Sequence, residues 1–182
     1  MTASDRASHN LITYSIQYYA VGRFAVLNRM HRIAPNLLHH AVELVLKASL
    51  VHHQSLKFLK NQYGHDLEKL WAATIAKTPT LSSPHRQQTI SDLAQFEELR
   101  YPDLLMTQGA TVAFSMDTGD RVSTSGSPSS TITEPLYQLN LQDIDELWAA
   151  LFYHADGKPE AFLQHLSEEA RAVLQFNNRH PI

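Results

Sequence analysis

The spacing of apolar residues after Pro35 is the feature that most constrains how this chain folds. Proline is favoured in the first turn of a helix, and the residues that follow Pro35 repeat with a helical period. At about 100° per residue, the apolar side chains fill one broad arc, which consists of Leu37, Leu38, Ala41, Val42, Leu44, Val45 and Ala48. Asn36, His40, Glu43 and Lys47 fill the opposite arc. The pattern predicts an amphipathic helix with one polar stripe.

The same period recurs through most of the chain, with capping residues and prolines at its boundaries. Asn10, Asp66 and the Ser83-Pro84 pair are helix-start signals, and Gly157 is a stop signal. We expect helices over residues 11–30, from residue 66 to a loop at 78–84, from residue 84 to about 99, from 141 to 157, and from 159 through 174. The sequence therefore predicts an all-α helical bundle.

Residues 104–140 depart from the helical pattern. Val112, Phe114 and Met116 alternate with small residues, as in a strand, and residues 132–139 have the composition of a second strand. We expect this segment to be a small strand-like insertion, either hairpin-like or mobile.

The chain is expected to form a single domain over residues 1–182, since its length is near that of one domain. A core bundle is predicted over residues 8–103, followed by the insertion and by C-terminal helices over 141–178. Residues 123–130, inside the insertion, are rich in serine, glycine and proline, which is typical of mobile segments.

The composition excludes several classes of protein. A net charge of −3 provides no overall basic field, as a dedicated duplex-DNA binder would have. The chain has no cysteine, which excludes disulfides and thiolate metal sites. Residues 1–10 are polar, and no stretch approaches the roughly 20 apolar residues of a membrane helix. We therefore expect a soluble, cytoplasmic protein.

The sequence contains none of the common metal-binding or cofactor-binding motifs. The 11 histidines include no His-Glu-x-x-His helix, and His39 and Glu43, although four residues apart, have no evident third ligand. Neither a phosphate-binding glycine loop nor a Gly-x-Ser-x-Gly motif is present. We therefore predict no metal site and no cofactor.

Three short segments, taken in order, carry a family resemblance. His-Ala-Val-Glu-Leu-Val-Leu-Lys at 40–47 precedes Tyr-Gly-His-Asp-Leu-Glu-Lys-Leu at 63–70, and Glu-Leu-Arg-Tyr-Pro-Asp follows at 98–103. Together they resemble the HEPN (higher eukaryotes and prokaryotes nucleotide-binding) family over residues 11–103. The resemblance implies an up-and-down antiparallel bundle of about four helices, often a homodimer. It also implies a role linked to nucleotides or RNA, commonly with a nucleotidyltransferase partner.

One branch of that family consists of metal-independent endoribonucleases, which carry an arginine and a histidine separated by four to six residues late in the bundle. Arg100 has no histidine at that spacing downstream, and Arg32 and His39 stand too early, with Pro35 between them. We therefore expect a non-catalytic nucleotide- or RNA-associated module. The alternatives are an endoribonuclease and a purely structural dimerisation module.

The three segments also predict a single polar site for a nucleotide, built from His40, Glu43, Lys47, His65 and Arg100. Lys47 and Arg100 would attract phosphate, and the start of the helix after His65 would offer backbone N–H groups to an anion. The alternative is a structural ion-pair network that ties helices together.

Self-association through helical faces is expected as well. Tyr18, Tyr19, Trp148 and Phe152 are more aromatic surface than a four-helix core requires. Two-fold dimers are the commonest assembly of soluble proteins.

Overall fold

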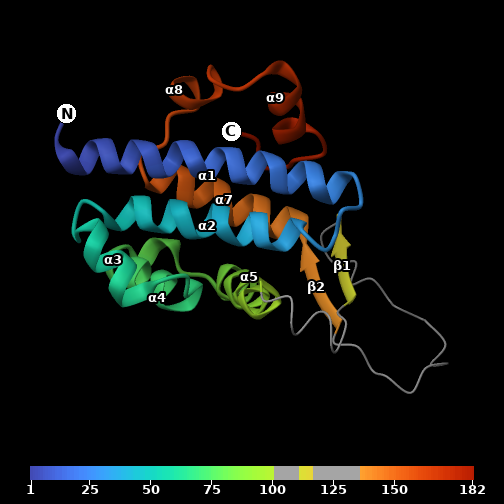
Figure 1. Ribbon diagram of the computed structural model, residues 1–182, viewed down its shortest axis with the longest axis horizontal. Helices are drawn as coiled ribbons and strands as arrows, with labels where there is room; N and C mark the ends of the chain where they lie inside the picture. The colour runs from blue at the N-terminus through green and yellow to red at the C-terminus, as the bar shows by residue number, and fades with distance from the viewer. Residues whose placement is uncertain (101–110, 117–135) are drawn as a thin grey trace.

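The computed structural model describes residues 1–100, 111–116 and 136–182 (Figure 1). Its helices are α1 (Ala3–Leu27), α2 (Ala34–Leu50), α3 (Leu56–Tyr63), α4 (Leu67–Lys77), α5 (Pro84–Ala94), α7 (Leu141–His154), α8 (Pro159–Leu163) and α9 (Glu168–Gln175). Two short 3₁₀ helices, η1 (Pro79–Leu81) and η2 (Gln95–Arg100), and two strands, β1 (Thr111–Ser115) and β2 (Leu136–Asn140), complete the described part. The prediction of a mainly helical protein is confirmed. None of the described helices is both long and apolar enough to cross a membrane.

The two longest helices, α1 and α2, run antiparallel and side by side, with α7 packed behind them (Figure 1). α2 is the central element, because it contacts α1, α4, α5 and α7. Most of its apolar arc is buried, as the periodicity predicts, and Leu37 and Leu44 at the edges of the arc are partly buried. The helices α8 and α9 lie on the other side of α1 from α2 (Figure 1).

Local sequence signals fix most helix starts. The side chain of Asp66 accepts a hydrogen bond from the backbone of Lys69 at the start of α4, and Ser83 caps α5 in the same way. α1 begins at Ala3 rather than at residue 11, because Thr2 and Asp5 form a capping box. The single helix predicted over 159–174 is instead two helices, since Ser167 caps a new start at α9.

Of the two alternatives predicted for residues 104–140, the hairpin-like one is wrong, because β1 and β2 pair in parallel. Thr111 aligns with Leu136 and Ser115 with Asn140, so both strands run in the same direction. Parallel strands cannot be joined by a tight turn and need a longer crossover. The predicted mobility of residues 123–130 lies outside the described residues.

Three of the four aromatic residues predicted to form an interface lie in the monomer core. The Tyr19 and Trp148 rings stack with centroids 4.1 Å apart, and Phe152 stacks on Trp148. All three side chains are essentially inaccessible to solvent. Of the four, only Tyr18 is exposed, so this set of residues does not form an apolar surface patch.

A buried ion pair joins α1 to α7. Arg23 and Asp145 are both fully buried and form a salt bridge, and the Tyr19 hydroxyl donates to Asp145 Oδ1 at 2.6 Å. The Arg23 guanidinium also donates to the carbonyls of Val173 and Phe176, at 3.1 and 2.6 Å. This pair therefore holds the C-terminal segment against the bundle.

Candidate functional site

The polar stripe of α2 meets the turn between α3 and α4. α3 ends at Tyr63, and Gly64 adopts a φ of 55°, a conformation that favours glycine. The chain then reverses and brings His65 over the middle of α2. As a result Glu43, which helical spacing placed on the solvent arc, is only 1% exposed.

The Glu43 carboxylate is the centre of a cluster of four side chains, His40, Glu43, Lys47 and His65, called the Glu43 cluster below. Oε1 accepts a hydrogen bond from Lys47 Nζ at 2.6 Å. Oε2 lies 3.2 Å from His40 Nδ1 and 3.0 Å from His65 Nδ1. Lys47 Nζ also donates to the Gly64 carbonyl at 2.6 Å, which ties α2 to the turn.

The cluster keeps Glu43 ionised. Burial alone would raise the pKa of this carboxyl, but hydrogen bonds from His40, Lys47 and His65 outweigh burial and lower the pKa to about 2. The side chains at the edge are more accessible: His65 is 48% exposed and His40 is 27% exposed. The cluster therefore places a fixed negative charge beneath two imidazoles that face solvent.

Four of the five predicted site residues thus come together. Arg100 is the last residue of η2, and its side chain is outside the described part of the structure. The predicted anion position at the start of α4 is already occupied, because the Asp66 carboxylate accepts from the backbone of Lys69 at 2.9 Å. Lys47 Nζ already donates one hydrogen bond to Glu43 and another to the Gly64 carbonyl.

His39 lies in the core. In the sequence it has the spacing from Arg32 that a nuclease pair would have. It is 2% exposed, and its ring nitrogens lie 3.1 Å from the Leu93 carbonyl and 3.2 Å from the His65 carbonyl. Burial lowers the pKa of His39, although the two carbonyls act in the opposite direction. Arg32 is exposed in the turn just before α2, so His39 joins helices in the core while Arg32 faces solvent.

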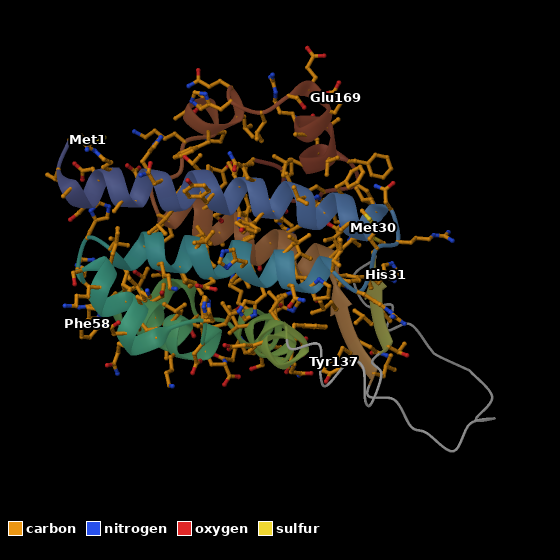
Figure 2. All side chains as sticks on the ribbon, viewed as in Figure 1. Met1, Met30, His31, Phe58, Tyr137 and Glu169 are labelled. Atoms are coloured by element: carbon orange, nitrogen blue, oxygen red, sulfur yellow. The ribbon has the colours of Figure 1, made fainter. Side chains whose placement is uncertain are left out.

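A second polar region, which sequence reasoning missed, is a groove where α1 turns into α2. A cavity of about 580 Å³ is lined by Arg29, Met30, His31, Arg32, Ile33, Thr111 and Val112. Met30 and His31 lie at this end of the bundle, beside β1 (Figure 2). Among the described residues, Arg29 and Arg32 form no salt bridge. The run Arg-Met-His-Arg at 29–32, which holds three basic residues in one short loop, could have indicated this groove from the sequence.

A third feature is an apolar stripe on the exposed side of α1. Tyr14, Tyr18, Val21 and Phe24 recur at three- and four-residue spacing and are between 37% and 57% exposed. The Tyr18 ring meets the His40 ring edge-on at 4.4 Å, so the stripe adjoins the Glu43 cluster.

Comparison with models of known families, with characterised proteins and with solved structures finds no match to this chain.

Proposed function

We propose that this protein is a HEPN-like helical module that binds RNA or a nucleotide without cleaving it. The main support for this proposal is the groove at residues 29–33. Two exposed guanidinium groups in it lack carboxylate partners among the described residues. The order of the three family-like segments supports the same reading. An acidic protein that concentrates unpaired arginines in one loop has a local attraction for phosphate despite its net charge of −3.

The groove has the composition that a nucleotide requires. Arginine holds phosphate in a bidentate fashion through its planar guanidinium, and both Arg29 and Arg32 are exposed. Met30 and Ile33 are 38% and 52% exposed and offer apolar surface to a base or ribose. A volume of about 580 Å³ is within the usual range for small-molecule sites.

The polar stripe of α2 extends the groove toward the Glu43 cluster. Asn36 and His40 are four residues apart on α2, which places them on one side of the helix, and Arg32 lies just before the helix begins. A bound RNA strand would therefore run from the groove along this stripe.

The arrangement favours binding over cleavage. Cleavage by attack of a 2′-hydroxyl needs a base within reach of the hydroxyl and a cation beside the phosphorane. His39 is the histidine whose sequence spacing from Arg32 matches the family motif. Its ring is buried between two backbone carbonyls. His65 is exposed and His40 is partly exposed, but a ring nitrogen of each faces the Glu43 carboxylate.

Fluorescence anisotropy with a labelled single-stranded RNA tests the proposal. The double substitution Arg29→Ala with Arg32→Ala should weaken binding at least about tenfold, because each charge-assisted hydrogen bond contributes roughly 1.5–3 kcal/mol. The slope of log affinity against log salt should become shallower by about 1.4, the value for two phosphates of a single strand. The matched control, Arg6→Ala with Lys57→Ala, removes two exposed cations from the first turns of α1 and α3. Equal losses in the two double variants, or no binding by the wild type, would reject the groove as the site.

A dimerisation role is a second candidate, and the α1 stripe favours it. Four exposed apolar side chains in one row, beginning at Tyr14 and ending at Phe24, form the kind of surface that usually lies in an interface. A homodimer would double the number of grooves available to one RNA strand. The resemblance also implies a nucleotidyltransferase partner, for which the same stripe is the available docking surface.

A further inference from the structure

Two imidazoles and one buried carboxylate converge in the Glu43 cluster. One ring nitrogen of His40, one of His65 and one oxygen of Glu43 all lie within 4.8 Å of one another. The His40–Glu43 pair comes from successive turns of α2, and His65 comes from a different segment. Two histidines and one carboxylate are a common ligand set of zinc and of non-haem iron. We propose that His40, Glu43 and His65 bind a divalent first-row transition metal.

The distances between ligand atoms are those of a metal site. Metal–nitrogen and metal–oxygen bonds of about 2.0–2.2 Å place neighbouring ligand atoms about 3.0–3.5 Å apart in octahedral or tetrahedral geometry. Glu43 Oε2 lies 3.0 Å from His65 Nδ1 and 3.2 Å from His40 Nδ1. The two histidine nitrogens lie within 4.8 Å of each other, and the half-exposed His65 side chain is free to move closer to His40.

The rest of the cluster prepares the carboxylate for this role. Lys47 holds Oε1 at 2.6 Å, which fixes the orientation of the carboxylate and leaves Oε2 directed at the two histidines. The Gly64 carbonyl, at 2.6 Å, holds Lys47 in turn. Such outer hydrogen bonds are characteristic of protein metal sites, where they orient the ligands.

Exposure of the two histidines leaves room for further ligands. Three protein ligands with an accessible outer side make an open site, in which water or a ligand oxygen completes the coordination. Imidazole nitrogens favour zinc, iron, nickel and copper over magnesium or calcium, which prefer oxygen alone. The sequence alone suggested His39 as the histidine beside Glu43. In the fold both ring nitrogens of His39 lie at hydrogen-bond distance from the backbone carbonyls of Leu93 and His65. His40 is instead the histidine of α2 that lies beside the Glu43 carboxylate.

The inference does not depend on RNA binding, because its test uses the metal alone. Calorimetric titration of the full chain, stripped with a chelator, should show one zinc ion bound per chain. Cobalt(II) added to a separate metal-free sample should develop visible absorption bands, and zinc added afterwards should remove them.

His65→Ala and His40→Ala should each lower zinc affinity at least about tenfold, in line with losses seen when ligand shells are disturbed. His65 is half exposed and makes one of the three hydrogen bonds to Glu43, so its variant should remain folded and lose less melting temperature than Glu43→Gln. His52→Ala is the matched control, because His52 is 45% exposed and lies 3.9 Å from a carboxylate, that of Asp5. Unchanged zinc affinity in both cluster variants, or a loss of the same size in His52→Ala, would overturn the proposal.

Discussion

Replacing Glu43 by glutamine tests the energetic role of the cluster, because the substitution keeps the shape of the side chain and removes its charge. The pKa of this carboxyl is about 2 in the folded protein against an ordinary value of 4.5. The difference corresponds to roughly 3 kcal/mol of folding free energy at neutral pH, at 1.36 kcal/mol per pKa unit. Glu43→Gln also leaves the Lys47 ammonium, 12% exposed, without its carboxylate partner.

The effect should depend on pH in a defined direction. Because the folded pKa lies below the unfolded one, the stabilisation is present above about pH 4.5 and is lost as the pH falls toward 2. The variant should therefore be less stable than the wild type by about 3 kcal/mol at neutral pH. The gap should shrink to roughly half or less near pH 3. In a chain of this length, 3 kcal/mol corresponds to a fall of about 6–12 °C in melting temperature.

Urea unfolding followed by circular dichroism, at neutral pH and near pH 3, measures both quantities. Glu160→Gln is the control, since Glu160 is exposed on α8 and its variant should stay within about 0.5 kcal/mol of the wild type. A Glu43→Gln variant as stable as this control would refute the account of the cluster. A gap of the same size at both pH values would show that charge is not the cause.

Two further predictions concern the core and the surface. Asp145→Asn should lower the free energy of unfolding by about 3–5 kcal/mol in urea titrations, because it leaves the buried Arg23 guanidinium without a counter-charge; a loss below about 1 kcal/mol would contradict the structural role of the pair. The wild-type protein should scatter light as a dimer at micromolar concentration, and Val21→Ser with Phe24→Ser, on the α1 stripe, should convert it to a monomer. A monomeric wild type would remove the dimer proposal.

The sequence predicts local structure well where the signal is local. Asp66, Ser83 and Pro35 each mark a helix start that the structure contains, since capping depends only on residues within one turn. The apolar arc of α2 is mostly buried, because helical periodicity alone places its residues on one face. Periodicity also brought His40, Glu43 and Lys47 to one stripe.

The sequence could not predict features that depend on contacts between segments far apart in the chain. Periodicity places Glu43 on the solvent side, and only the turn at Gly64 and His65 buries it. Arg23 stands among apolar residues of α1, and its partner Asp145 is far away in the chain. Helical spacing likewise cannot tell that Trp148 packs on α1 rather than on a second molecule. The parallel pairing of the strands cannot be predicted from their own alternation, which is the same in parallel and antiparallel pairs.

The central claim is that the protein binds RNA or a nucleotide and leaves RNA intact. The most direct measurement mixes the pure full-length protein with an end-labelled single-stranded RNA, records anisotropy, and then runs the same sample on a denaturing gel. The account predicts saturable binding with the RNA recovered at full length. Absence of binding would contradict the claim, and so would shortened RNA that is no longer produced by a folded His39→Ala variant.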